Sequence, residues 1–322
     1  MPYNSLITEA DLSAAINRPE YSNEIYQAAI AQSAVMSMAQ RAPNMGTGVR
    51  KISVMDTLPL AYFVGSTQGV PNKKQTTEMS WKGKDLTAEE IAVIVPIPEA
   101  TLADASIDLA AQILPRIGEA MGRTLDAAVL AGTNLPATWM TDTTGTASAV
   151  VPACLATGNY VADTGDVYAD VLGADGVFSL VEQDGYMVNG SLMAPSFMGR
   201  IRGTVGVDGH PIFVRALDGS YALAGERVMV QRNGASSNTV PLISGDWSQI
   251  IWAVRQDVTV KLLTEGVIQD NQGAITHNLA QQDMVALRVV FRVAVQIANP
   301  VTNDNTTEAT RYPFACLATA VS

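Results

Sequence analysis

The side chains that most often carry catalysis or bind metals are few in this chain, and none is spaced for that chemistry. Neither His210 nor His277, the only histidines, has a histidine, cysteine or carboxylate partner at ligand spacing. Cys154 and Cys316 lie far apart in the sequence and outside any metal-binding pattern. No Gly-x-Ser-x-Gly elbow and no Gly-x-x-x-x-Gly-Lys phosphate loop occurs. The sequence therefore predicts no catalytic, cofactor-binding or metal-binding residue, and it argues against an enzyme.

A group of lysines and aromatic residues instead suggests contacts between molecules. Its members lie in or beside a polar, glycine-containing stretch, Gly65 to Ser80. Aromatic side chains concentrate at interface hot spots, although these could equally pack two strands of the same chain together. The lysines could pair with carboxylates of a neighbour, each exposed pair contributing about 0–1 kcal/mol, or they could simply be solvated or paired within the chain. The candidate contact residues are Tyr62, Phe63, Lys73, Lys74, Trp81, Lys82 and Lys84.

These residues belong to a long predicted arm that feeds a long predicted helix. Residues 52–64 form an apolar-alternating strand, residues 81–98 return from the polar tip, and residues 102–131 have helical periodicity. An arm of this length without a core of its own needs a partner surface, which indicates an assembly protein. We expect Thr101 or Asp104 to cap the helix, Gly132 to end it and Pro115 to kink or break it. The predicted buried stripe is Ile107, Ala110, Leu114, Ile117, Met121, Leu125 and Ala128.

The remaining segments differ in periodicity. The weakly helical stretch before Pro43 is poor in apolar residues, so we expect it to lie on another surface as an N-terminal arm. Residues 133–164 are small and polar and predict an irregular region. The last two long strands are rich in Val and Ile and should pair. The other predicted elements are a helix at 168–181, a strand at 186–188, a helix at 194–202, a hairpin at 205–214, and strands at 228–231, 250–263 and 284–297.

Composition narrows the function further. With 322 residues the chain has room for two domains or one elaborated domain. Charged residues make up only 16%, which suits a surface buried against other subunits, and the net charge of −11 argues against binding to nucleic acid. Such a charge suits a surface that lies near DNA without adhering to it. No signal peptide or membrane span is predicted, since Arg288 and Arg292 interrupt the longest apolar run, and both cysteines should be buried thiols in a reducing compartment.

Several phrases, taken in order, resemble the major capsid protein family of tailed bacteriophages. Together they cover most of residues 50–322. They are the entry to a long spine helix (Val95–Asp104 with Ser106–Leu109), its acidic, alanine-rich closing phrase (Leu125–Asn134), a glycine-aspartate-aromatic-serine phrase with the strand after it (Gly245–Val260), a long return strand (Val285–Val295) and a closing strand (Phe314–Leu317).

The resemblance implies an α+β fold, the phage major-capsid fold. Residues 1–49 would be an N-terminal arm across neighbouring subunits, and residues 50–98 an extended β-hairpin loop reaching over the adjacent subunit. Residues 99–134 and 244–300 would form a peripheral domain with the spine helix and long strands. Residues 135–243 and 301–322 would form an axial domain at the symmetry axes.

The implied function is self-assembly, as hexamers and pentamers, into an icosahedral shell around phage double-stranded DNA, with assembly in the host bacterial cytoplasm. An encapsulin-like compartment shell and a ligand-binding or enzymatic domain are the alternatives. Many relatives begin with a charged scaffolding segment, whereas this chain begins with Met and the arm, so we expect a separate scaffolding protein. Portal and decoration proteins are further implied partners. Some relatives cross-link a loop lysine to an asparagine; we expect no cross-link here.

Overall fold

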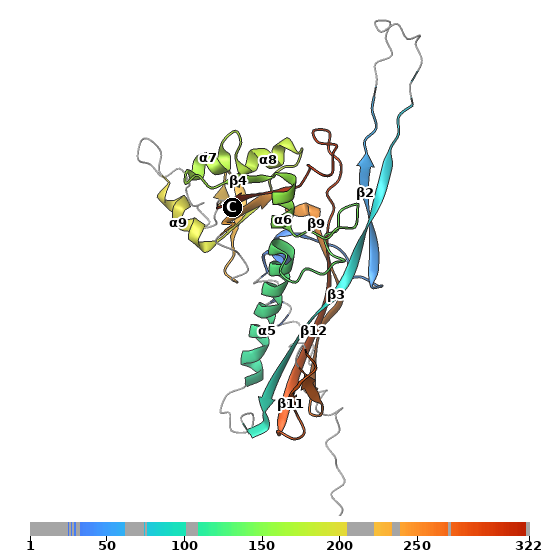
Figure 1. Ribbon diagram of the computed structural model, residues 1–322, viewed down its shortest axis with the longest axis vertical. Helices are drawn as coiled ribbons and strands as arrows, with labels where there is room; N and C mark the ends of the chain where they lie inside the picture. The colour runs from blue at the N-terminus through green and yellow to red at the C-terminus, as the bar shows by residue number, and fades with distance from the viewer. Residues whose placement is uncertain are drawn as a thin grey trace, which may run out of the picture.

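The computed structural model describes residues 33–61, 74, 76–100, 109–204, 222–233, 239–269 and 272–319, with residues 25, 27 and 29; for residues 109–112 it describes the backbone alone. The long sheet runs down one side of the molecule (Figure 1). Its five strands have the order β1-β9-β12-β3-β2. They are β1 (Gln40–Arg41), β9 (Ile250–Leu263), β12 (Met284–Ile297), β3 (Ser80–Pro98) and β2 (Val49–Thr57).

The two longest predicted strands of the C-terminal half are confirmed at their predicted bounds. β9 and β12 pair antiparallel from Ile250↔Ile297 to Leu263↔Ala286, with the register shifting near Arg292. β12 also pairs antiparallel with β3, from Met284↔Pro98 to Ala294↔Ala88. β12 is therefore a central strand, and most of its Val, Ala and Phe side chains are buried, as expected for a strand covered on both faces.

The spine helix packs along this sheet. It consists of α5 (Leu109–Asp126) and a π-helical turn, η2 (Ala127–Ala131), and ends at Gly132, whose φ of 79° is the left-handed conformation that favours glycine. The predicted stop is confirmed. Of the kink or break predicted at Pro115, the break is wrong, because α5 continues through this residue. The missing hydrogen bond is offset by burial of the apolar stripe, of which Leu114, Ile117, Met121, Leu125 and Ala128 are all buried.

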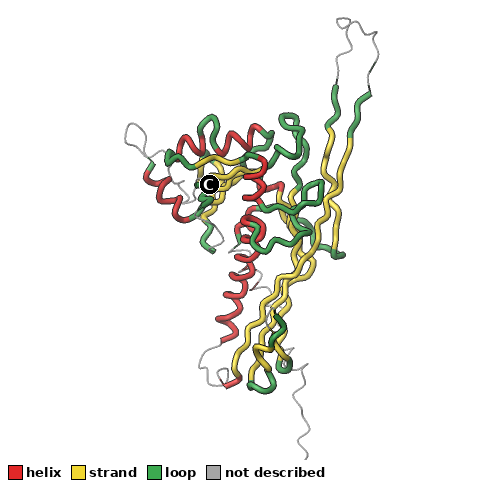
Figure 2. Tube along the Cα trace, viewed as in Figure 1, coloured by secondary structure: helices red, strands yellow, loops and turns green. Residues whose placement is uncertain are grey.

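A six-stranded sheet with several short helices forms the compact part of the molecule (Figure 2). Its strand order is β4-β13-β8-β5-β7-β6. The strands are β4 (Tyr160–Ala162), β5 (Gly190–Met193), β6 (Ala222–Leu223), β7 (Glu226–Val230), β8 (Leu242–Gly245) and β13 (Phe314–Ala318). The helices are α6 (Val150–Thr157), α7 (Val167–Leu172), α8 (Val177–Gln183) and α9 (Pro195–Gly203).

Three predictions in this part are corrected. Residues 133–164 contain α6 and β4, because the short run at 150–155 is apolar enough to pack on β13. The helix predicted over 168–181 is two helices, since Gly173 and Gly176 approach backbone so closely that a side chain would not fit. The strand predicted at 186–188 lies later, at β5, where the chain pairs with β7 and β8. The helix at 194–202 and the strand at 228–231 are confirmed within one or two residues.

The glycine-aspartate-tryptophan-serine phrase joins the two sheets. Asp246 caps the short 3₁₀ helix η3 (Trp247–Gln249) by accepting from the Ser248 amide at 3.1 Å. The fully buried Trp247 donates its indole N–H to the Gly190 carbonyl at 3.0 Å and contacts Phe314 edge-on at 5.2 Å between ring centroids. β8 ends just before this turn and β9 starts just after it, so the buried tryptophan packs at the junction of the two sheets.

The end of the N-terminal segment is part of this chain's own core. α3 (Ala34–Met38) buries Ala34, Val35 and Met36 against the spine helix and the sheets. The expectation that this segment lies on a different surface is thus wrong for residues 33–38, because three consecutive apolar residues there outweigh the polar composition of the stretch as a whole.

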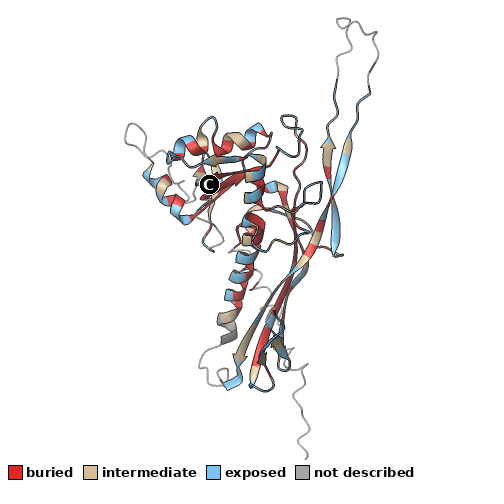
Figure 3. Ribbon diagram, in the orientation of Figure 1, coloured by how far each residue is buried: buried red, intermediate tan, exposed pale blue. Residues whose placement is uncertain are grey.

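Two hairpins extend from opposite ends of the long sheet. β10 (Val267–Gln269) and β11 (Ile275–Asn278) form the shorter one, and the ends of β2 and β3 form the longer one, which leaves the body entirely (Figure 1). The longer hairpin is coloured mostly exposed or intermediate in Figure 3. The predicted hairpin at 205–214, the caps Thr101 and Asp104, and Ile107 lie outside the described residues.

Candidate functional site at the base of the extended hairpin

The extended hairpin has a buried base and an exposed end. β2 pairs antiparallel with β3 through Ile52↔Lys84, Val54↔Lys82 and Met55↔Trp81. Because side chains alternate along a strand, Lys82, Lys84, Leu86 and Ala88 share one face of β3. Leu86 and Ala88 are buried in a small core with Met45, Ala253 and Ala294, so this face turns into the body as the hairpin reaches it.

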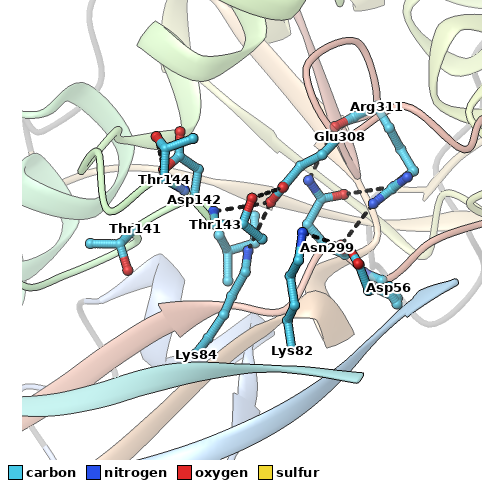
Figure 4. Close-up of polar contacts among 12 residues, drawn as sticks. Asp56, Lys82, Lys84, Thr141, Asp142, Thr143, Thr144, Asn299, Glu308 and Arg311 are labelled. Atoms are coloured by element: carbon cyan, nitrogen blue, oxygen red, sulfur yellow. Dashed lines mark hydrogen bonds and ion pairs between the residues drawn. The ribbon is translucent and has the colours of Figure 1, made fainter. Parts of the chain in front are cut away.

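Lys84 is buried at this base. Its side chain is only 4% exposed, and its Nζ lies 3.7 Å from Oε1 of Glu308 (Figure 4). The Thr143 amide donates to the same carboxylate at 3.2 Å, and the Thr143 hydroxyl donates to its other oxygen. A lysine proposed as an outward contact is therefore an internal one: it pairs with Glu308, 224 residues later in the sequence, and Glu308 in turn accepts from Thr143.

Burial dominates the electrostatics of this lysine. Removal from water lowers the pKa of Lys84 below its ordinary value, against the opposing attraction of Glu308 and Asp142. Burial also acts on Asp142, but hydrogen bonds from Thr144 and Thr146 leave the pKa of its carboxyl lowered. Both carboxylates thus lie where they compensate a charge that is costly to bury.

The loop that carries Glu308 is held rigidly. Arg311 is buried and donates to the carbonyls of Asn299 at 3.2 Å and Asn305 at 3.0 Å, and Asn299 donates back to the Arg311 carbonyl at 3.1 Å. The same loop reaches β2, because the Val301 amide donates to the Met55 carbonyl at 3.1 Å. Figure 4 shows this arginine-asparagine pair directly beside the lysine-glutamate pair.

A second loop fastens the other side of β3. The Trp139 indole donates to the Thr87 carbonyl at 2.9 Å, and the Thr138 hydroxyl donates to Glu89 at 2.7 Å. From β12, Gln296 donates to the Asp85 carbonyl at 3.0 Å. These bonds hold the strand without forming any nucleophile, acid–base pair or ligand cluster; the described part of the chain has no group of three or more His, Cys, Asp or Glu side chains arranged for a metal. At its base the hairpin is thus held against the body from both sides of β3.

Of the other predicted contact residues, some lie at the exposed end of the hairpin and the rest are not among the residues that the structure describes. Tyr62, Phe63 and Lys73 lie outside it, and Lys74 is exposed. Lys82 pairs with Asp56 across the strands at 3.0 Å and keeps half of its side chain in solvent. Trp81 is 58% exposed, and two large apolar residues near it are also exposed, Leu60 to 62% and Met79 to 40%. An exposed tryptophan beside two exposed aliphatic side chains is unusual for an isolated monomer and typical of an interface.

Glu308, Thr143 and Arg311 were not among the residues that the sequence predicted. Each is separated from Lys84 by a long stretch of chain and stands in a polar segment with no local pattern. The one usable signal was the alternation of Lys84 with Leu86 and Ala88, which places the lysine on an apolar face.

Comparison with known proteins agrees with this architecture. The model of the phage capsid family matches residues 16–301. The chain is 24% identical over 304 residues to the major capsid protein of Staphylococcus phage 80alpha, covering 92% of this chain and 86% of that one. A solved structure from Microbacterium phage Oxtober96 is 34% identical with a TM-score of 0.74 and covers 98% of this chain and 100% of its own. One from Mycobacterium phage Adephagia is 30% identical with a TM-score of 0.75, covering 90% and 91%.

A more distant similarity concerns the fold alone. The capsid of an empty GTA particle, computed with C5 symmetry, is 16% identical, with a TM-score of 0.57 and 90% of each chain covered. Within the described residues, no helix is both long enough and apolar enough to cross a bilayer.

Proposed function

This chain belongs to the phage capsid family, and on that premise we propose that it self-assembles, as hexamers and pentamers, into the icosahedral shell that encloses phage double-stranded DNA. The observation that carries the proposal is the extended hairpin. It leaves the body and exposes Leu60, Met79 and Trp81, for which the described part of the chain offers no covering surface. A second copy would supply that surface.

The rigid base supports the same proposal. A hairpin that must meet a neighbour at a fixed angle needs its direction set by its own chain, and the Lys84–Glu308 pair with the surrounding loops does this. The acidic net charge of −11 fits a shell that confines DNA without adhering to it. No catalytic role is proposed.

We assign the five-stranded sheet and the spine helix to a peripheral domain, and the six-stranded sheet with α6 to α9 to an axial domain at the symmetry axes. Residues 1–49, in this proposal, are an arm whose first part reaches neighbours while residues 33–38 anchor it. A scaffolding protein, a portal and decoration proteins are the further partners. The site of action is the virion, after assembly in the bacterial cytoplasm.

Electron microscopy of the purified protein, expressed alone and together with a scaffolding partner, tests the proposal. Closed icosahedral particles or arrays of hexamers and pentamers are the expected result. A monomer under every condition would contradict self-assembly. Shells that copurify with protein cargo and never package DNA would instead indicate an encapsulin-like compartment.

A further inference from the structure

A groove beside the end of the spine helix gathers positive charge in an otherwise acidic protein. It has a volume of about 670 Å³ and is lined by one face of α5, the turn at Thr133 and Asn134, and the segment that follows β7. Three arginines on its walls are exposed: Arg116, Arg123 and Arg232. Because the whole chain has a net charge of −11, the groove is a local reversal of sign.

The elements that carry these arginines hold them in fixed positions. Arg116 and Arg123 are two helical turns apart on α5, so they lie on one face, about 10 Å from each other along the helix axis. Arg232 comes from the other wall. Its neighbour Asn233 donates to the buried Asp126 carboxylate at 2.6 Å, which holds this wall against the last residue of α5.

The chain itself neutralises only part of this charge. Arg116 forms a salt bridge with Glu119 at 2.8 Å. Arg123 and Arg232 form no ion pair with any residue in the portion of the chain that is described. The groove therefore presents two guanidinium groups to solvent, and such groups bind the oxygens of phosphates or carboxylates through two parallel hydrogen bonds.

The rest of the lining favours phosphate over a protein partner. Among the described residues that line the groove, none is aromatic and none is a large aliphatic residue. Protein interfaces gain most of their binding energy from buried aromatic and apolar anchors, whereas phosphate contacts come from arginine, hydroxyl and amide groups. Thr133 and Asn134, both exposed, add a hydroxyl and an amide to the arginines. The groove is therefore suited to a nucleic-acid backbone.

We propose that this arginine groove binds the phosphodiester backbone of the enclosed DNA without reading its sequence. The inference rests on the proposed function, which supplies duplex DNA as the phosphate-bearing ligand. Phosphates of one strand recur about every 3.4 Å along the duplex axis, so Arg116 and Arg123 span about three of them. The acidic charge of the whole chain opposes DNA, so each contact is weak and sensitive to salt, and the DNA is held at many points.

The test measures how the unassembled full-length protein, cleared of particles by sedimentation, binds a labelled duplex of random sequence at several salt concentrations. Arg123→Gln with Arg232→Gln should weaken binding about tenfold in low salt. It should also reduce the slope of log affinity against log salt by about 2, because two phosphate contacts are lost. The matched control is Lys261→Gln with Arg288→Gln, which removes the same charge from an exposed cross-strand pair on β9 and β12. The control should leave that slope unchanged.

A conservative pair of substitutions separates loss of charge from loss of folding. Arg123→Lys with Arg232→Lys keeps both positive charges and should retain most of the binding, since lysine also binds phosphate as a point charge. Circular dichroism checks that every variant is folded. A lysine variant that is folded but binds as weakly as the glutamine variant would contradict an electrostatic contact with phosphate.

Other results would assign the groove differently. Equal losses in the groove and control variants would mean that DNA responds to net charge alone, which would overturn the proposal, as would a wild type that binds no duplex in low salt. Inorganic phosphate at matched ionic strength should not displace the duplex; displacement would assign the groove to a small phosphate ligand. Displacement by a polyglutamate peptide at matched ionic strength would assign it to an acidic protein segment.

Particle formation, scored separately by electron microscopy, distinguishes this inference from the proposed function. A wild type that binds duplex through the groove but never forms particles would contradict self-assembly alone. Normal particles from a groove variant that no longer binds duplex would support the inference, because the groove would then serve DNA rather than contacts between copies. Normal particles from a groove variant that binds duplex like wild type would overturn the inference and leave self-assembly intact.

Discussion

At the residue scale, Lys84 is a charged side chain whose burial costs free energy but whose ion pair holds β3 to a distant loop. Its ammonium group is buried with one carboxylate at 3.7 Å, so attraction and desolvation oppose each other. Buried ion pairs of this kind are often no more stable than well-packed apolar side chains of the same size. An apolar residue, however, would not hold Glu308, and through it Thr143, at one point on β3. We therefore interpret the pair as a contact that orients the extended hairpin rather than one that adds stability.

A double-mutant cycle tests this interpretation. Glu308→Gln should lower the free energy of unfolding by about 1–3 kcal/mol, because it leaves a buried ammonium without its main counter-charge. Adding Lys84→Met should recover most of that loss. Chemical denaturation measures both. The control, Lys82→Met, removes a half-exposed pair and should cost only about 0–1 kcal/mol. A Glu308→Gln variant as stable as wild type would mean that the pair carries no coupling.

The same lysine predicts a dependence on pH. Burial lowers its pKa in the folded protein below the ordinary value of 10.5, so between those two values the unfolded chain binds more protons. Stability should therefore rise with pH through that alkaline window, and the cost of burying the charge should be fully present below it. Denaturation of wild type and Lys84→Met at several pH values isolates this effect. The free energy of unfolding of wild type should rise relative to that of Lys84→Met as pH approaches 10.5. A difference between the two that does not change with pH would contradict the prediction.

At the scale of elements, the N-terminal segment and the spine helix are joined through one buried carboxylate. Asp126, the last residue of α5, accepts from the Ser33 hydroxyl at 2.7 Å and from the Ala34 and Val35 amides at 2.8 and 3.2 Å. Burial raises the pKa of this carboxyl, opposed by these hydrogen bonds. The helix α3 therefore starts where the helix α5 ends, and the arm is anchored at that point.

Gly122 permits this close approach. A Cβ at that position would lie 2.9 Å from the Ala29 carbonyl oxygen and 3.3 Å from the Ser33 amide nitrogen. Gly122→Ala should thus lower the free energy of unfolding by about 1–3 kcal/mol and increase hydrogen exchange at residues 33–38. Gly199→Ala is the matched control, since that helical glycine faces open space and alanine there should be neutral or stabilising by about 0.5–1 kcal/mol. Equal effects of the two substitutions would contradict the close-packing explanation.

Elements were predictable where one local pattern determined them. β9 and β12 follow from long runs of Val and Ile, and the end of the spine helix follows from Gly132. Prediction failed for α6, because its short apolar run is flanked by a long stretch of small polar residues. It also failed for α3, whose burial depends on Asp126 some 90 residues later. The contacts at the base of the hairpin could not be predicted for the same reason: Lys84 and Glu308 are far apart in the sequence, and local periodicity does not indicate their pairing.

At the scale of the whole molecule, the compact body and the extended hairpin have separate roles, and this separation can be tested. Thr57 and Ser80 face each other across β2 and β3, so residues 58–79 can be replaced by Asn-Gly, which suits a two-residue hairpin turn. The shortened protein keeps the Lys82–Asp56 and Lys84–Glu308 pairs. Its free energy of unfolding should therefore change by no more than about 1 kcal/mol, because the base is intact.

Assembly of the shortened protein should nevertheless fail, since it has lost the part of the hairpin that leaves the body. Sedimentation and electron microscopy would show a folded monomer or small oligomer. A second variant, with Leu60→Ser, Met79→Ser and Trp81→Ser, retains the length and removes the exposed apolar side chains. A strong defect there too would assign the energy of the contact to those side chains, and a mild one would assign it to backbone and reach. Normal shells from both variants would mean that copies assemble through the body alone.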